Sequence, residues 1–478
     1  MAWSNRKLYA LLTILGSAIY VSLLLNGHLF PSAASVAKIY QRLAPVKAKT
    51  TTDTRKAVTP LSTFQQRRQH FIDACIARRR LGNLNVTKSL QVFHVGDLAM
   101  CLVPKTGSTL WKQILFYLDT NQSGPFFEVN FSGIHRRMQP RSQQAVRILR
   151  EGVVTAVFVR EPYSRLFSAY VDKLFKPRED NWRVYGRPVV NYVRRTSAAV
   201  GKTCAGNVTF AEFVRYFIDS ETKPEAKLRR NEHYTPQSQH CGFCTSVEGS
   251  RRLQDNQKVK MLENVDNKRQ GVTGQMDNID ASSMGHFQDK LREGFLVYDF
   301  IGKTESILAD TWAILEASHL ARRLPASLDM DKDAGKHTIT RTIRNVFESA
   351  NTTASSCVSK EEKLRRTWKN FHIRGMISKR ELFPLTPAEA DDVTIEGMQE
   401  LALAAFDKST SDPELKRNKK EAMIEAYSTI PLTDRQSLRR IYAADFELFQ
   451  YPPSIPEVFP EGDKFHLGSY RFFNIFDK

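Results

Sequence analysis

The sequence predicts an α/β domain in which a parallel sheet is flanked by helices, with a single N-terminal transmembrane helix ahead of it. Two apolar runs, at 98–103 and 153–159, have the composition of buried strands, and each leads through a polar turn into an amphipathic segment. A third apolar stretch, at 8–28, is long enough to span a bilayer. With 478 residues, 41% of them hydrophobic and 25% charged, the chain can also bury a substantial core.

The first strand is followed by a loop that suits an anion. The loop enters a helix predicted over 110–118 and reads Pro104-Lys105-Thr106-Gly107-Ser108-Thr109. The first turn of a helix presents free N–H groups and the positive end of the helix dipole. Lys105 adds a cation, Gly107 lets the backbone come close, and Ser108 and Thr109 add two hydroxyls. For this stretch alone, the alternative is an ordinary surface turn that enters a helix.

The order of residues in this loop disfavours an ordinary P-loop NTPase. In the Walker A pattern G-x-x-x-x-G-K-[ST] the lysine follows the second glycine, whereas Lys105 precedes Gly107. The loop nevertheless has the groups that a phosphate or a phosphosulfate needs.

The second strand delivers an arginine to a similar turn. Arg160 follows the apolar run directly, and Pro162 marks the first turn of the next helix. That helix has an apolar face, formed by Leu166, Phe167, Tyr170 and Leu174. Arg160 and Ser168 could hold a second phosphate, the arginine through a two-pronged contact.

These two motifs resemble those of the Golgi carbohydrate sulfotransferases that use 3′-phosphoadenylyl sulfate (PAPS), especially the branch with chondroitin, dermatan, N-acetylgalactosamine 4-O and HNK-1 sulfotransferases. Residues 101–111 are similar to the 5′-phosphosulfate loop of the family, and residues 159–173 to its 3′-phosphate motif. Weaker matches follow at His233-Tyr234-x-Pro236 with Cys241-x-x-Cys244, at Tyr298 to Glu305, and at Tyr442 to Tyr451. The similarity covers about 90–312 and a short C-terminal piece.

The resemblance implies a P-loop-like sulfotransferase domain that takes PAPS as sulfate donor and a glycan hydroxyl as acceptor, with no metal. The donor would be bound by Pro104, Lys105, Thr106, Gly107, Ser108, Thr109, Arg160 and Ser168. Lys105 would also stabilise the charge that develops on the leaving PAP. The acceptor would be a glycosaminoglycan or an N-glycan, with N-acetylgalactosamine as the favoured sugar.

A histidine between the two motifs is the candidate general base. Related enzymes have a histidine at a comparable distance before the 3′-phosphate arginine, and His135 occupies that place here. An imidazole suits the proton transfer because its ordinary pKa lies near neutrality. The alternative is a solvated loop histidine beside two acceptor-contacting residues, Arg136 and Arg137. His233 is the second candidate, with a structural role under the acceptor cleft as its own alternative.

Residues 8–28 are expected to anchor the chain in the membrane. Arg6 and Lys7 favour a cytoplasmic tail at 1–7 and a lumenal remainder, although downstream basic residues weaken this bias: Lys38, Arg42, Lys47 and Lys49. The alternative is a cleaved signal peptide, because 32–34 offers small residues. Both alternatives send the chain into the secretory pathway, and the resemblance implies a single-pass type II protein of the Golgi membrane.

The catalytic domain is expected to follow a flexible stem. The stem covers 29–63, and the domain covers 64–478 and begins with a basic helix at 64–81. Two polar segments interrupt the resemblance, at 247–293 and 324–434, and we expect both to be surface insertions with local helices such as 387–403. Five glycosylation sequons fit a lumenal chain: Asn85, Asn121, Asn130, Asn207 and Asn351.

The charge of the chain points to acidic partners. Seventy lysines and arginines against 51 acidic residues give a net charge of +19, which suits nucleic acid, an anionic membrane or a polyanionic glycan. A nucleic-acid binder would not explain a lumenal address or paired phosphate loops. A non-catalytic, lectin-like binder of sulfated glycans is the alternative to the enzyme, and the intact set of Lys105, His135, Arg160 and Ser168 argues against it.

The chain has six cysteines, and an oxidising lumen permits disulfides between them. The expected disulfide pool is Cys204, Cys241, Cys244 and Cys357. Cys101 is expected to pack as a free thiol in its strand. A zinc site at Cys241-x-x-Cys244 is disfavoured because no second ligand pair follows.

Overall fold

The computed structural model describes the ranges 58–80, 92–120, 126–127, 153–195, 204–244, 297–350 and 357–476. All of them belong to one compact unit; a second unit, 1–55 with 279–285, lies outside the described residues. Within the described ranges no helix is both long and apolar enough to cross a membrane. The predicted anchor at 8–28 and the predicted insertion at 247–293 lie outside these ranges.

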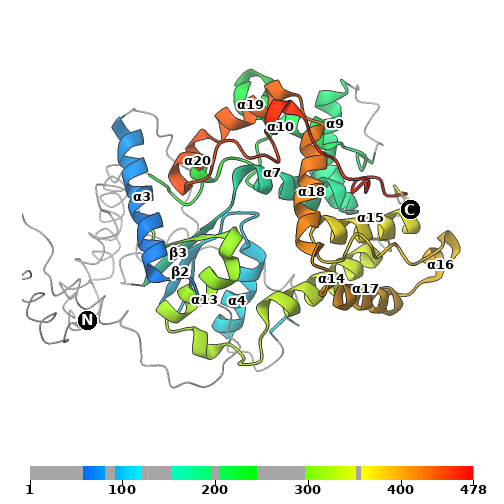
Figure 1. Ribbon diagram of the computed structural model, residues 1–478, viewed down its shortest axis with the longest axis horizontal. Helices are drawn as coiled ribbons and strands as arrows, with labels where there is room; N and C mark the ends of the chain where they lie inside the picture. The colour runs from blue at the N-terminus through cyan, green and yellow to red at the C-terminus, as the bar shows by residue number, and fades with distance from the viewer. Residues whose placement is uncertain are drawn as a thin grey trace, which may run out of the picture. The chain divides into compact units, whose positions relative to one another are not determined.

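A small sheet lies in one half of the unit (Figure 1). Its strands, in the order in which they pair, are β1 Val92–Val95, β2 Leu98–Cys101, β3 Val154–Val159 and β4 Phe300–Lys303. The pairs β2·β3 and β3·β4 are parallel, as predicted, but β1 runs antiparallel to β2. Only Gly96 and Asp97 join β1 to β2, and so short a connection permits only an antiparallel pair. The expected all-parallel sheet is thus corrected at its edge.

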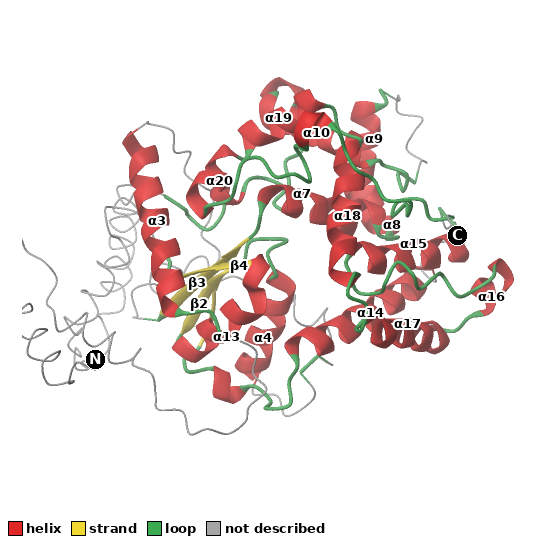
Figure 2. Ribbon diagram, viewed as in Figure 1, coloured by secondary structure: helices red, strands yellow, loops and turns green. Residues whose placement is uncertain are grey.

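The two faces of the sheet pack against different helices (Figure 2). Ala156 and Phe158 of β3 join a core with α4 Ser108–Thr120 and α13 Ile307–Ala317. Val157 and Val159 point to the opposite face, because side chains alternate along a strand. They join a larger core built with α3 Leu61–Arg80, α7 Pro162–Tyr170, α10 Phe210–Thr222 and α20 Ala443–Phe449. The predicted helices after the two strands and at 64–81 are confirmed.

Short helical segments and α19 complete this part of the unit. They are the π-helical η2 Val171–Phe175 and η3 Trp182–Gly186, and the helices α8 Glu179–Asn181, α9 Arg187–Val193 and α19 Leu432–Ile441. Segment η2 continues α7 without a break, so the second phosphate motif runs on into it.

The polar segment 324–434 is packed, not peripheral. Its helices are α14 Met330–Ala350, α15 Lys360–Ile373, α16 Pro387–Asp392, α17 Ile395–Ser409 and α18 Leu415–Ser428. Helices α14 to α17 enclose an apolar core of their own around Trp368 and Phe406, while Ile373 of α15 and Tyr427 of α18 are buried in the main core. The expectation of a surface insertion is wrong here, because each amphipathic helix needs a partner for its apolar face. The helix expected at 387–403 is split at Val393, between α16 and α17.

All six cysteines form disulfides. The pairs are Cys75–Cys244, Cys101–Cys241 and Cys204–Cys357, with Cα atoms 5.2, 5.8 and 5.5 Å apart. The expected pool was therefore too small, and the free thiol expected at Cys101 is wrong. Because Cys241 and Cys244 take partners from β2 and α3, neither sulfur is a zinc ligand.

Candidate functional site: an anion-binding cleft

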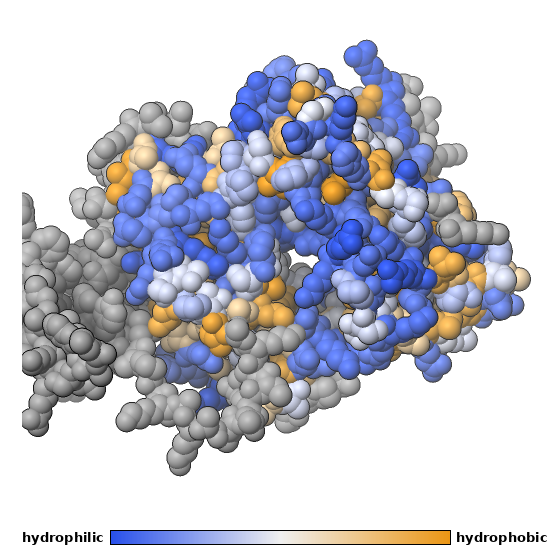
Figure 3. Space-filling model, in the orientation of Figure 1, coloured by the Kyte–Doolittle hydropathy of each residue, from blue (hydrophilic) through white to orange (hydrophobic). Residues whose placement is uncertain are grey.

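One open cleft, of about 2290 Å³, runs between the sheet half of the unit and helices α14, α15 and α18. Its basic lining residues are Lys105, Lys112, Arg160, Lys173, Lys176, Arg178, Arg323, Lys336, Arg341, Arg344, Arg374 and Lys419. Only four carboxylates join them: Asp172, Glu232, Asp333 and Glu348. Figure 3 shows the face hollowed near its middle, with hydrophilic side chains on the side of α18. The electrostatics of the cleft favour an anionic ligand.

The predicted phosphosulfate loop forms one wall and has the backbone conformation of an anion cradle. Lys105 and Gly107 have positive φ angles of 71° and 85°. A Cβ atom on Gly107 would lie 2.4 Å from Cδ1 of Ile307 and would have to adopt this positive φ, so a larger residue here would be strained and would displace Ile307. The buried Thr106 hydroxyl donates to the carbonyl of Val103 at 2.8 Å and braces the turn. Helix α4 begins at Ser108, which lines the cleft, so the free N–H groups of the first helical turn belong to the same wall.

The Lys105 ammonium is paired within the cleft. Its Nζ lies 3.0 Å from Oδ2 of Asp172, and Lys173 Nζ lies 3.5 Å from the same oxygen. Burial lowers the pKa of Lys105 to about 8, although Asp172 acts to raise it. Burial alone would raise the pKa of Asp172, but Lys105, Lys173 and Lys176 hold it well below its ordinary value. Asp172 therefore favours the charged form of Lys105 in a partly buried site.

Arg160 and Ser168 line the same cleft, as predicted for the second anion position. The Arg160 guanidinium donates to the Ser164 hydroxyl, at 3.1 Å from Nε and 3.0 Å from Nη2, and to the Lys105 carbonyl at 3.2 Å from Nη1. This last contact joins the two predicted phosphate motifs directly. All the predicted donor residues except the buried Thr106 thus line one cleft.

Two buried groups that the sequence analysis did not single out position these motifs. The Gln237 side chain accepts from Arg160 N at 2.8 Å and donates to Arg160 O at 2.7 Å, and Asp445 in turn accepts from Gln237 N at 2.7 Å. Arg165 donates to the carbonyls of Pro104 and Thr235, at 2.9 and 2.6 Å. Gln237 lies beside a weaker matched motif, next to Pro236, whereas Arg165 lies within the 3′-phosphate motif at 159–173.

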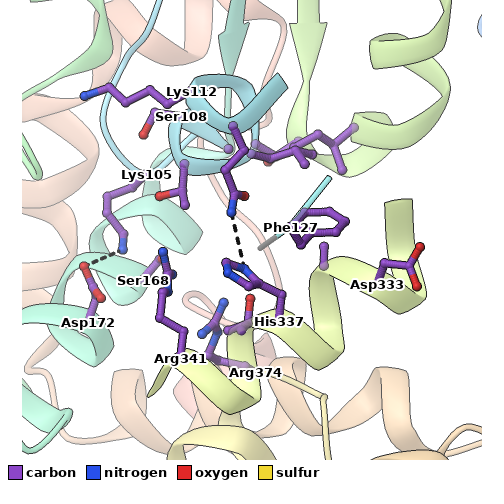
Figure 4. A pocket seen from close by; sticks show the side chains of 18 of the residues that line it. Lys105, Ser108, Lys112, Phe127, Ser168, Asp172, Asp333, His337, Arg341 and Arg374 are labelled. Carbon is purple, nitrogen blue, oxygen red and sulfur yellow. Dashed lines mark hydrogen bonds and ion pairs between the residues drawn. The ribbon is translucent and has the colours of Figure 1, made fainter. Parts of the chain in front are cut away.

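The helical segment contributes cations that the sequence analysis missed. Arg341 lies on α14, Arg374 at the end of α15, and Lys419 on α18, and all three line the cleft. In Figure 4 Arg341 and Arg374 lie on the side facing the Lys105–Asp172 pair, and Asp172 acts electrostatically on both. The charge of Arg160, followed by burial, lowers the pKa of Lys419 to about 7. These cations repel one another, so a bound anion would reduce the electrostatic repulsion in the cleft.

The candidate general base, His135, lies outside the described residues. His233 lines the cleft and its Nδ1 lies 2.7 Å from Oδ1 of Asn231; burial lowers its pKa to about 3. A third histidine, His337 of α14, also lines the cleft, and burial lowers its pKa to about 4. The sequence analysis did not predict His337 as a site residue, because it lies in the polar segment 324–434, where no motif was identified.

Comparisons with known proteins match the part of the chain that carries the two predicted phosphate motifs. The sulfotransferase family model matches residues 89–278, which include both phosphate motifs. Over these residues the chain is similar to the sulfotransferase family. Its curated relatives include carbohydrate sulfotransferase 11 of Rattus norvegicus, 28% identical over 193 residues, and carbohydrate sulfotransferase 14 of Homo sapiens, 34% identical over 154 residues. Carbohydrate sulfotransferase 8 of Mus musculus is 25% identical over 167 residues.

These matches cover only part of each protein. They span 38%, 30% and 33% of this chain, and 54%, 37% and 40% of the respective relatives. The chain thus spans about half the length, or less, of the sulfotransferases it matches. Helices α14 to α18 lie outside the part covered by the family model. No solved structure matches the chain significantly.

Proposed function

We propose that the chain transfers a sulfuryl group from PAPS to a hydroxyl group of a glycan in the Golgi lumen. The observation that carries this proposal is the direct contact between the two anion positions, in which Arg160 donates to the Lys105 carbonyl at 3.2 Å. A donor with a phosphosulfate at one end and a 3′-phosphate at the other needs two adjacent anion sites. The relatives named as carbohydrate sulfotransferases support a carbohydrate acceptor.

The proposed reaction is an in-line displacement at sulfur. The acceptor oxygen bonds to sulfur while the bond from sulfur to the bridging phosphate oxygen breaks, and PAP leaves with the bonding electrons. Lys105 and the first-turn N–H groups of α4 stabilise the charge that grows on PAP. The hydroxyl proton passes to a base, for which we propose His135. Arg160 and Ser168 bind the 3′-phosphate and take no part in bond changes.

The favoured acceptor is N-acetylgalactosamine in chondroitin, in dermatan or at the end of an N-glycan. We also propose that residues 8–28 anchor the chain as a type II Golgi protein. The complete pairing of the cysteines supports an oxidising compartment. Protection of a C-terminal tag from protease in intact Golgi vesicles, lost on adding detergent, tests this orientation.

The decisive experiment is transfer of labelled sulfate from PAPS by the full chain to desulfated chondroitin, dermatan, heparan and N-glycan acceptors. We expect label on at least one acceptor, and its loss in Lys105→Ala and in His135→Ala. Lys408→Ala and His466→Ala are controls, because both side chains are exposed away from the cleft. Folded protein that binds PAP but labels none of these acceptors would favour the lectin-like binder instead.

A further inference from the structure

Helix α14 presents a row of side chains to the cleft that the donor motifs do not use. His337, Arg341 and Arg344 follow one another at spacings of four and three residues, so they share one face of the helix, and all three line the cleft. The helix lies outside the part covered by the family model. Its cleft-facing row is therefore a feature of this chain's own helical segment.

The donor half of the unit fixes the orientation of His337. Nε2 of Gln113, on α4, lies 3.3 Å from Nδ1 of His337, and the ring of Phe127 stacks on the imidazole at a centroid distance of 5.5 Å. Figure 4 shows this arrangement, with Phe127 and His337 side by side. The amide holds Nδ1, and among the described residues no group takes a hydrogen bond from Nε2. This leaves a fixed ring edge beside an aromatic side chain, which suits the polar edge and the apolar face of a sugar.

The basic residues of α14 differ in whether a carboxylate pairs with them. Lys332 and Lys336 lie 4.0 and 2.9 Å from carboxylate oxygens of Asp407 on α17. Arg344 is exposed in the cleft, and no carboxylate of the described ranges forms an ion pair with it, although Glu348 lines the cleft one turn away. A cation kept in a cleft without a counter-ion is suited to an anionic ligand.

We propose that this face of α14 binds the acceptor, and that the acceptor is a glycan chain carrying carboxylate or sulfate groups. This proposal rests on the proposed function. His337 and Arg344 are seven residues apart, or about 10 Å along the helix. A single sugar does not span that distance, whereas a chain can place one sugar at His337 and an anionic group of a neighbouring sugar at Arg344. Arg341 lies between them on the helix and interacts electrostatically with Asp172, the partner of Lys105.

The test compares Arg344→Glu with Lys332→Glu, which makes the same charge change on the same helix but outside the cleft. We expect Arg344→Glu to raise KM at least about tenfold for a uronate-bearing chondroitin chain, because a hydrogen-bonded charge contact is lost. KM for a neutral N-glycan of equal length, and the affinity for PAP in calorimetry, should stay unchanged. Equal effects of the two variants, or equal effects on both acceptors, would overturn the proposal.

A binding measurement separates this proposal from the proposed function. With PAP present, we expect Arg344→Glu and His337→Ala to elute from immobilised chondroitin at lower salt than the wild type, and Lys332→Glu to elute with the wild type. This result would hold even if no sulfate were transferred. Unchanged elution of both cleft variants would rule out α14 as the acceptor site even if the chain is an active sulfotransferase.

Discussion

At the scale of single residues, the cleft depends on charges that are kept ionised at a cost. Lys105 is partly buried and has a pKa of about 8, because burial lowers this pKa further than Asp172 raises it. Gly107 occupies a backbone conformation that only glycine adopts without strain, and its α-carbon faces Ile307. Both residues act through the shape and charge of one loop.

The pH dependence of PAP binding should report on Lys105. Each ammonium is charged below its pKa and neutral above it, so affinity for PAP should fall as the pH rises through about 7, where Lys419 loses its charge, and again through about 8, where Lys105 does. Asp172→Asn removes a carboxylate that raises the pKa of Lys105, and the second fall should then begin at a lower pH. Calorimetric titration with PAP from pH 6 to 9.5 measures it. Asp180→Asn, at an exposed position, should leave the profile unchanged; an identical shift in both variants would contradict the assignment.

Gly107→Ala should lose PAP affinity and stability together. The new Cβ would have to occupy φ 85° and lie 2.4 Å from a side-chain carbon of Ile307, and we expect a cost of about 1–3 kcal/mol. Thermal unfolding and PAP calorimetry measure the two effects. Gly468→Ala is the matched control, because no atom lies within 4 Å of a Cβ there. If the two variants behave alike, the cradle does not require glycine.

At the scale of elements, segments that are far apart in the sequence hold the donor motifs in place. Gln237, from the segment before the CxxC, clamps the backbone of Arg160, and Asp445 of α20 holds Gln237. Helices α15 and α18 bring Arg374 and Lys419 to the same cleft. The cleft is therefore built from the C-terminal half as well as from the matched strands.

Gln237→Ala should weaken PAP binding, although the Gln237 side chain does not line the cleft. The change leaves the N–H and C=O groups of Arg160 without their partner, at a cost of about 1–3 kcal/mol, and frees the arginine to move. We expect the Kd for PAP to rise while kcat at saturating PAP stays near the wild-type value. Gln239→Ala, two residues away and exposed, serves as the control. A fall in kcat alone would argue against a positioning role.

Arg374→Ala should affect both affinity and pH dependence. We expect PAP to bind about tenfold more weakly, because a cation of the cleft is lost. Arg374 also acts to lower the pKa of Lys105, so in the variant the decline of affinity should begin at a higher pH. Arg380→Ala removes an arginine that is paired outside the cleft and should change neither property. If the affinity for PAP instead began to fall at a lower pH than in the wild type, the proposed effect of Arg374 on the pKa of Lys105 would be contradicted.

At the scale of the whole unit, three disulfides tie together parts that are distant in sequence. Cys75–Cys244 fixes α3 to the region after the second phosphate motif, and Cys101–Cys241 fixes β2 to the same region. Cys204–Cys357 joins the residues just before α10 to the residues just before α15. Each bridge closes a loop of 140 residues or more.

Reduction should therefore lower stability strongly. In the chain-entropy model a loop of this length contributes about 4–5 kcal/mol, so the reduced protein should unfold at a much lower temperature. Thermal unfolding with and without reductant measures the effect, and mass spectrometry of unreduced peptides checks the pairing. Cys204→Ser with Cys357→Ser tests one bridge alone. Reactive thiols in the untreated, folded protein would refute the complete pairing.

The sequence alone determined the elements whose signals are local. The strands at 98–103 and 153–159 and the helices that follow them are defined by apolar periodicity and by the residues of the turns between them. The donor loop, Arg160 and Ser168 could be placed for the same reason. Strands β1 and β4 are no shorter than β2, but neither lies in an apolar run as long as those at 98–103 and 153–159, and they were not predicted.

Only the tertiary structure decided what depends on packing between distant segments. The pairing of Cys75 and Cys101, the clamp of Gln237 on Arg160, and the arrival of Arg374 and Lys419 in the cleft all join residues far apart in the chain. A polar, amphipathic segment such as 324–434 gives the same local pattern at the surface as against a core. Its place is decided by which apolar faces meet, and that is a property of the folded chain as a whole.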